Sequence, residues 1–309
     1  MKDGFHMMDY SWVAELPSEE MKKEAYRELG KVDLFFFAKY ILNYDMEETT
    51  DIHSRFCSIL DENRLRQLML MFRGSYKTSL GIAKVIQWMI ADPASQIGIG
   101  SDTIERAIER TREVKRVLES NTLLHELYPD VFYKEPKRES DLWTTSEFNI
   151  KRPMDKLAGF IKPSVSSFGL FPLPVGSHYT RVLLDDTEHE DRVNTPELIQ
   201  QLNVRVSSLM PTLQPQAPVV MLGTIYCPNG PNTLYQRVWP TYKVPIVDKQ
   251  GLPTFPTKFS TQVIEQLKSD INDEYIWKGQ YMLESALRTD KFTFPYKNVQ
   301  LKIFQEFLR

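Results

Sequence analysis

Short, continuous apolar runs recur along the chain and alternate with longer amphipathic segments. The runs at 67–72, 96–100, 179–184 and 218–222 have the length and composition of buried β-strands. Between 80 and 90, directly behind the first run, apolar residues recur with helical spacing. Strands that alternate with helices are typical of a parallel sheet covered by helices on both faces. The pattern therefore predicts an α/β protein with a central, mainly parallel sheet.

Outside these runs, the sequence predicts helices in the N-terminal part and loops with short strands in the middle of the chain. Residues 1–60 have the pattern of amphipathic helices, and their aromatic-rich segment at 32–42 is expected to pack on a core. The middle stretch, 129–178, is rich in Pro, Ser, Gly and aromatic residues and suits loops with short strands at 148–150 and 157–161.

A helix predicted at 104–118 has one apolar face and one charged face. Asp102 and Glu105 have the spacing of a capping box at its start. The charged face includes Arg106, Arg110, Arg112 and Arg116 among glutamates. Pairs at i,i+4 favour a solvated face, and contact with DNA phosphates or a neighbouring subunit is the alternative.

Composition limits the size and class of the protein but does not indicate a reaction. The 309 residues, 42% of them hydrophobic, suffice for one large α/β domain with a small appendage. The net charge of −3 gives no sign of nucleic-acid binding, so any DNA contact would need a local basic patch. Cys57 and Cys227 lie far apart, which predicts neither a disulfide framework nor a zinc site and fits a reducing cytoplasm. No apolar run reaches the roughly 18 residues of a membrane span.

The break after the first strand is the segment that suggests a function. Residues 73–76 are a small-residue loop that delivers Lys77 and Thr78 onto the following helix. Backbone N–H groups and a Lys ammonium in this arrangement bind phosphates, and the Thr78 hydroxyl is suited to a Mg²⁺ shell. Met71 and Tyr76 replace the two glycines of the pattern G-x-x-x-x-G-K-[ST]. A strand-to-helix turn with a solvated lysine is the alternative.

Two later strands also end in polar groups. The third run ends in Asp185 and Asp186, and Glu188 follows. ATP hydrolysis needs one carboxylate near Mg²⁺, which we assign to Asp185, and another that orients the attacking water, which is Asp186 or Glu188. The fourth run ends at Thr224, whose hydroxyl could sense a γ-phosphate. Each of the three segments (the loop before Lys77, the acids after the third run, and Thr224 after the fourth) also fits an ordinary turn by itself. Their occurrence in this order along one chain makes a nucleotide site the better interpretation.

These residues together resemble the large terminase subunit of tailed bacteriophages, the ATPase that pumps DNA into a preformed capsid. The match runs from about His53 to Leu287. It is carried by residues 73–79, 97–119 with 120–130, 183–188 with 194–197, 222–224 with 233–235, 255–259 and 279–283. The phosphate loop is similar to the variant form of that family, in which an Arg precedes Gly and the residue before Lys need not be Gly.

The resemblance implies a role for each matching residue. Arg73 would stabilise charge in cis, Thr224 would couple hydrolysis to movement, and His53 would contact adenine, although a satisfied core or surface histidine is its alternative. A neighbouring subunit would supply a further arginine, for which Arg138 and Arg152 are candidates. The residues implied to bind ATP are His53, Arg73, Gly74, Ser75, Tyr76, Lys77, Thr78 and Ser79, with Thr78 and Asp185 at Mg²⁺ and Asp186, Glu188, Arg73 and Thr224 in catalysis.

The resemblance also implies a domain plan. Residues 1–244 would be a P-loop NTPase domain of the ASCE type, with 1–60 as its helical N-terminal part. Residues 245–309 would be a small lid or linker subdomain. The nuclease of the family is not expected, because Asp270, Asp273 and Glu274 fall on a predicted amphipathic helix with a solvated acidic face.

The sequence therefore predicts an ATP- and Mg²⁺-dependent motor subunit that moves viral double-stranded DNA into a procapsid. Its implied partners are the portal protein, the small terminase subunit and further copies of itself in a ring, with no membrane. Its implied location is the cytoplasm of the infected bacterial host. The alternatives are a helicase-like nucleic-acid translocase and an inactive nucleotide-binding or structural module.

Overall fold

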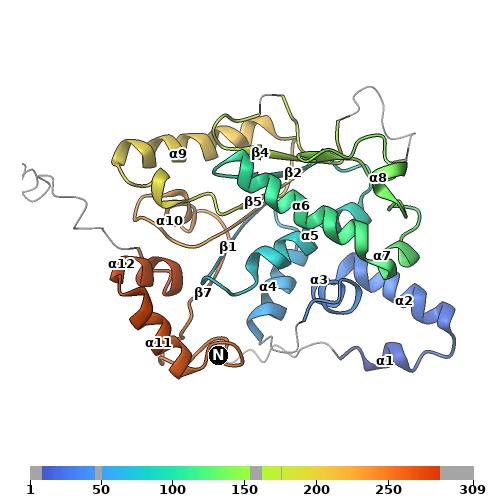
Figure 1. The fold of residues 1–309 in the computed structure, drawn as a ribbon, viewed down its shortest axis with the longest axis horizontal. Coiled ribbons are helices and arrows are strands. Elements are labelled where there is room, and N and C mark those ends of the chain that lie inside the picture. Colours follow the sequence, from blue (N-terminus) through green and yellow to red (C-terminus); the bar gives the residue numbers. More distant parts are fainter. Residues whose placement is uncertain (1–8, 46–50, 154–161, 175, 286–309) are drawn as a thin grey trace, which may run out of the picture.

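Seven strands form one sheet in the order β3-β4-β2-β5-β6-β1-β7 (Figure 1). The computed structural model describes residues 9–45, 51–153, 162–174 and 176–285. Every neighbouring pair is parallel except β3 with β4. The predicted α/β class with a mainly parallel sheet is confirmed. The strands are β1 Arg66–Met71, β2 Ile97–Ser101, β3 Glu147–Phe148, β4 Val165–Gly169, β5 Arg181–Asp185, β6 Val219–Gly223 and β7 Thr241–Val244.

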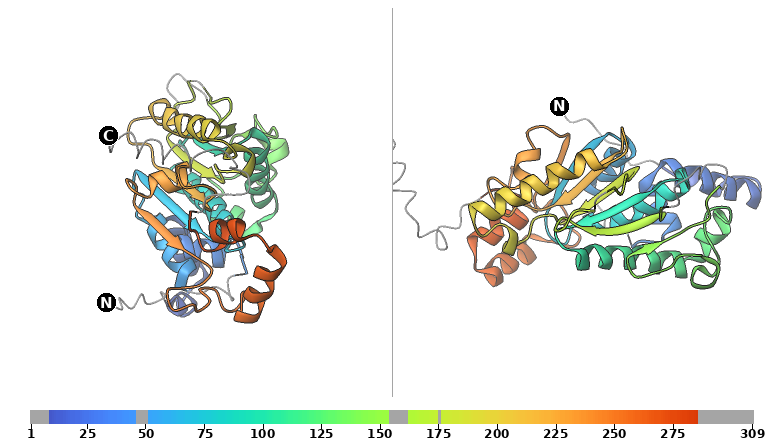
Figure 2. Two further views of the ribbon diagram at one scale, coloured as in Figure 1. Left: turned by 90° about the vertical axis from the view of Figure 1, so that its left-hand side faces the viewer. Right: turned by 90° about the horizontal axis from the view of Figure 1, so that it is seen from above.

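Helices cover both faces of this sheet (Figure 2). The α-helices are α1 Ser11–Ala14, α2 Glu19–Val32, α3 Leu34–Phe36, α4 Asp51–Asp61, α5 Lys77–Ala91, α6 Ile104–Ser120, α7 Thr122–Leu127, α8 Pro136–Glu139, α9 Pro196–Leu209, α10 Pro231–Tyr235, α11 Thr261–Ile271 and α12 Glu274–Ile276. Two π-helical turns, η1 Phe37–Ile41 and η5 Trp277–Tyr281, continue α3 and α12, and 3₁₀ turns lie at Glu190–Arg192 and Met210–Thr212. No helix in these ranges is long and apolar enough to cross a membrane.

Alternate residues of β1 face two different cores. On β1, Met69 and Met71 join the cluster under α3 to α6, whereas Leu68 and Leu70 join the cluster under α9. Side chains of successive strand residues point to opposite faces, so a strand covered on both sides is apolar at every position. This explains why the buried strands read as continuous apolar runs.

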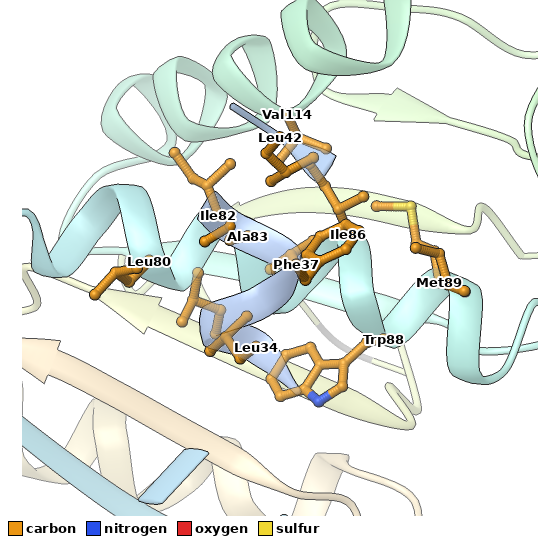
Figure 3. Close-up of a cluster of buried hydrophobic side chains, with 14 of the residues drawn as sticks. Leu34, Phe37, Leu42, Leu80, Ile82, Ala83, Ile86, Trp88, Met89 and Val114 are labelled. Carbon is orange, nitrogen blue, oxygen red and sulfur yellow. The ribbon is translucent and has the colours of Figure 1, made fainter. Parts of the chain in front are cut away.

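Helix α5 is buried almost all round rather than along one face. Figure 3 shows the reason: α3 and η1 pack over the side of α5 that faces away from the sheet. Leu34 and Phe37 from this N-terminal part lie in the same core as Ile82, Ile86 and other side chains of α5. The aromatic segment at 32–42 is therefore a core layer, as predicted.

Other elements differ from the sequence predictions. The cap of α6 is Thr103, which accepts from the Arg106 amide at 3.5 Å, and not Asp102, which is buried and pairs with Arg106 at 3.2 Å. Strands β4 and β7 have no counterpart among the predicted strands. The strand predicted at 148–150 corresponds to β3, and the one at 157–161 lies outside the described residues.

The chain after β7 forms a small unit, which we call the C-terminal segment (residues 245–285). It lies at the opposite end of the molecule from α1 and α2 (Figures 1 and 2). Its apolar side chains share a core with Phe72, the residue that follows β1. The buried members of this core are Phe72, Ile246, Phe255, Ile264, Trp277 and Tyr281. The segment is thereby packed against the start of the loop between β1 and α5.

Candidate functional site

The carboxyl ends of β1, β6 and β5 lie side by side, because β6 pairs in parallel with β1 on one side and β5 on the other. In this register, Leu70 lies opposite Gly223, and Asp185 lies opposite Leu222. In open α/β sheets, ligands bind outside the carboxyl ends of the strands. The three strand ends that the sequence singles out therefore meet at one edge of the sheet.

The loop between β1 and α5 is a tight turn with two left-handed residues. Gly74 has a φ of 87° and Tyr76 a φ of 66°, and α5 begins at Lys77. Beneath the loop, Nε2 of the buried His53 lies 2.8 Å from the carbonyl oxygen of Ser75. A carbonyl only accepts, so Nε2 carries the hydrogen. Burial lowers the pKa of His53 to about 4, so its ring is neutral at neutral pH.

A cavity of about 440 Å³ lies beside this loop. In the loop and beneath it, two buried polar atoms, Ser75 Oγ and His53 Nδ1, have no hydrogen-bond partner among the residues that the structure describes. Apolar and aromatic walls with a few polar groups are typical of ligand pockets. The cavity is lined by Asn43, Tyr44, Asp45, His53, Tyr76, Ser79, Leu80, Ile82, Glu113, Arg116 and Val117. His53 and Ser79, both predicted at the nucleotide, thus border one cavity.

Charged and hydroxyl groups from α5, β5 and α6 meet next to the loop. The Thr78 hydroxyl lies 3.2 Å from both carboxylate oxygens of the buried Asp185, and Arg110 Nε donates to one of them at 2.8 Å. Lys77 Nζ lies 3.5 Å from Asp186 Oδ1. Burial and the Asp186 carboxylate raise the pKa of Asp185 to about 7, against the effect of Lys77 and Arg110. The site therefore holds two acids and two cations.

This donor set fits Mg²⁺ in company with a nucleotide. Mg²⁺ is usually bound through one or two carboxylates, water and substrate phosphates rather than by an all-protein cage. Thr78 and Asp185 supply two hard oxygen donors in contact with each other. In the described residues there is no group of three His, Cys, Asp or Glu side chains that could hold a metal alone. Phosphate oxygens would have to complete the shell.

The two candidates for the second carboxylate lie in different surroundings. Strand β5 ends at Asp185, and Asp186 has a φ of 47°, so the alternation of the strand does not continue to Glu188. The Glu188 side chain is buried and accepts from the backbone amides of Tyr226 at 3.0 Å and Asn232 at 2.6 Å. Burial raises its pKa to about 7, although these two hydrogen bonds act in the opposite direction. The structure brings Asp186, and not Glu188, to the ammonium of Lys77.

Thr224 and Arg73 both adjoin the C-terminal segment. Thr224 is buried at the end of β6, and the next amide, that of Ile225, donates to the carbonyl of Gly279 at 3.2 Å. Arg73 is exposed, and its Nη1 donates to Gln280 Oε1 at 2.8 Å. In this structure the Arg73 side chain is directed to the C-terminal segment.

The two arginines considered for a neighbouring subunit also differ. Arg152 is half-buried and donates to the carbonyls of Lys162 and Ser95, so its guanidinium is bound within its own chain. The Arg138 side chain is 80% exposed and pairs with Glu135, the residue before its own short helix α8. Of the two, Arg138 is the one that another molecule could reach.

Two residues of the site are not indicated by the sequence patterns. The prediction that Arg110 lies on a solvated face is wrong, because its guanidinium contacts Asp185. Arg110 is next in sequence to Thr111, one of the buried residues of α6. This position beside the buried face is the one feature of the sequence that could have indicated its role. Lys258 of the C-terminal segment donates to the Gly74 carbonyl at 3.1 Å and lies 4.0 Å from the centre of the Tyr76 ring. No sequence pattern links these two distant segments.

Comparison with known proteins finds similar structures. No protein-family model matches the sequence, and no curated protein matches it. A point mutant of the large terminase ATPase domain of Thermus phage P74-26 is similar at 13% identity and a TM-score of 0.47, over 82% of this chain and 98% of that one. The bacteriophage HK97 large terminase is similar at 11% identity and a TM-score of 0.48, over 76% of this chain and 50% of that one.

A large terminase from a thermophilic bacteriophage, solved in complex with ADP, is similar at 11% identity and a TM-score of 0.41, over 83% and 52% of the two chains. The chain thus spans about half the length of the two whole large terminases. At such identities the likeness concerns the fold alone.

Proposed function

We propose that this chain is a Mg²⁺-dependent ATPase that drives the packaging of double-stranded DNA into a viral procapsid. The observation that carries the proposal is the meeting of four groups at one edge of the sheet. Thr78 lies 3.2 Å from Asp185, and Lys77 lies 3.5 Å from Asp186. An ammonium, a hydroxyl and two acids around a phosphate loop are the groups that phosphoryl transfer to water requires.

Each group has a part in the proposed hydrolysis. Lys77 holds the outer phosphates and balances the negative charge of the transition state. Asp186, which is half-buried beside Lys77, orients the attacking water. Mg²⁺, held by Thr78 and Asp185, would neutralise charge on the phosphate oxygens when bound. The nucleobase occupies the cavity beside the loop, where His53 and Ser79 form part of the wall.

The motor role rests on the link between the site and the C-terminal segment, which we propose as the lid. Contacts from Arg73, Lys258 and Ile225 join that segment to the phosphate loop and to the end of β6. Loss of a γ-phosphate near Thr224 would therefore be transmitted to it. The proposed partners are DNA, the portal protein, the small terminase subunit and a ring of identical chains in the cytoplasm of the infected host.

The assignment is tested by removing the charges. We expect Lys77→Ala and Asp185→Ala each to abolish ATP turnover at saturating ATP, while circular dichroism shows an intact fold. Nucleotide binding is measured in parallel, because turnover of a ring motor depends on assembly. Turnover within a few-fold of the unaltered protein, for either variant, would contradict the site.

The second carboxylate is identified by a matched pair of amide variants. Asp186→Asn should bind ATP and fail to hydrolyse it. Glu188→Gln should keep turnover but lower the melting temperature, because a carboxylate that accepts two backbone hydrogen bonds is replaced by a group with one acceptor. The reverse result would place the catalytic role on Glu188.

A further inference from the structure

The Arg110 side chain contacts the acid that the proposed metal site needs. Its Nε donates to Asp185 Oδ2 at 2.8 Å, and its Nη1 pairs with Glu113, one turn further along α6. The Arg110 side chain is only 24% exposed, and that of Asp185 is 1% exposed. The guanidinium therefore bridges two carboxylates, one at the strand edge and one on its own helix.

Each acid at the strand edge faces a cation. Lys77 faces Asp186, and Arg110 faces Asp185. A charged carboxylate buried without a countercharge costs several kcal/mol, so the buried Asp185 needs a cation beside it. In the metal-free protein the cation in direct contact with Asp185 is Arg110, and Lys77 acts on the same carboxylate from further away.

A divalent cation would need the same carboxylate. Two cations that share one acid repel each other, and the repulsion is strong where water is largely excluded. Glu113 gives the guanidinium a second anchor that does not depend on Asp185, because both residues belong to one helix. Release of one contact would thus leave Arg110 paired.

We propose that Arg110 is a positioning residue that stands in for the divalent cation beside Asp185 and yields to it, with Glu113 retaining the guanidinium. The inference rests on the proposed function, because it takes Asp185 as the metal carboxylate. It predicts effects of opposite sign for two neighbouring side chains, which a merely structural role would not produce.

The test is binding of Mn²⁺ to the full chain in the presence of saturating ADP, followed by electron paramagnetic resonance. Arg110→Gln removes the competing cation, so we expect about tenfold tighter Mn²⁺ binding, the change that corresponds to about 1.4 kcal/mol. Glu113→Gln removes the second anchor and should weaken Mn²⁺ binding several-fold. Arg106→Gln is the matched control, because Arg106 is on the same helix and pairs with Asp102 instead. It should change the affinity less than twofold.

A second measurement compares melting temperatures without and with the metal. In EDTA, Arg110→Gln should melt below the unaltered protein, because Asp185 loses its countercharge, and Mn²⁺ with ADP should raise its melting temperature by more than it raises that of the unaltered protein. If Arg110→Gln does not fold, Arg110→Lys replaces it. We then expect Mn²⁺ to bind Arg110→Lys more tightly than it binds the unaltered protein.

The outcomes separate the inference from the function on which it rests. Unchanged or weaker Mn²⁺ binding by Arg110→Gln would overturn the inference, since the guanidinium would then only hold Asp185 in place. Changes of the same sign in the Arg110 and Glu113 variants would overturn it as well. If the unaltered protein bound no Mn²⁺ with ADP, the proposed function would fail, and the inference with it.

Discussion

At the scale of the residue, Tyr76 shows how a departure from a sequence pattern is accommodated. Its φ of 66° is the left-handed conformation that glycine adopts freely at such a position, and a side chain there costs about 1–2 kcal/mol. The Tyr76 ring contacts the ammonium of Lys258 at 4.0 Å and the ring of Phe255 at 5.8 Å. These contacts offset the strain, so the missing glycine does not by itself indicate an inactive loop.

His53, whose ring centre lies 6.0 Å from that of Tyr76, gives a pH-dependent prediction. Burial lowers its pKa from 6.5 to about 4, so between these values the unfolded chain binds a proton that the folded chain does not. The neutral His53 ring therefore contributes to the free energy of unfolding fully above pH 6.5. This contribution is lost as the pH falls, by about 3 kcal/mol at pH 4. A glutamine side chain does not titrate, so urea unfolding of His53→Gln should lose less stability than the unaltered protein from pH 7 to 4. An equal loss in both proteins would contradict the prediction.

At the scale of the element, η5 joins three strand ends. Its last carbonyls have no partner within the helix, as at any helix end. The carbonyls of Gly279, Gln280 and Tyr281 accept in turn from the amides of Ile225, Arg73 and Ile246. These donors follow β6, β1 and β7, which are neighbours in the sheet. One helical turn is therefore bonded to the chain leaving each of three adjacent strands.

Gly279 is the tightest point of this contact. A Cβ at this position would lie 2.3 Å from the Ile225 carbonyl oxygen, so Gly279→Ala must displace η5 from β6. We expect the contact to weaken by about 1–3 kcal/mol. Hydrogen exchange should become faster over 255–285 while β1 and β5 keep their protection. Glu265→Ala, at an exposed position of α11, is the control and should leave exchange unchanged.

At the scale of the whole molecule, the sequence predicts what is local and misses what depends on contacts between distant segments. Strands β1, β2, β5 and β6 are recognisable because burial on both faces makes them continuously apolar. Strand β4 is not, because serines at 166 and 167 interrupt its apolar pattern. The place of β6 between β1 and β5, and the reach of Arg110 to Asp185, follow from packing that no spacing in the sequence records.

A buried polar network ties the N-terminal helices α2 and α3 to α4 and α5. Lys84 of α5, 2% exposed, donates to Asp61 of α4 at 2.9 Å and to Gln87 at 2.8 Å. Asp61 also accepts from the amide of Leu34 at the start of α3, and Gln87 donates to the carbonyl of Gly30 in α2. Four helices therefore share one charge pair, which makes their packing interdependent.

The stability of the whole domain should therefore depend on this pair in a non-additive way. Asp61→Ala leaves the ammonium of Lys84 buried with Gln87 as its remaining partner, and we expect a loss of about 3–5 kcal/mol in the free energy of unfolding. Adding Lys84→Met removes the uncompensated charge, so the double variant should be more stable than Asp61→Ala alone. Denaturant unfolding of the four proteins gives the coupling energy. Losses that simply add would mean that the two side chains act independently and would contradict the prediction.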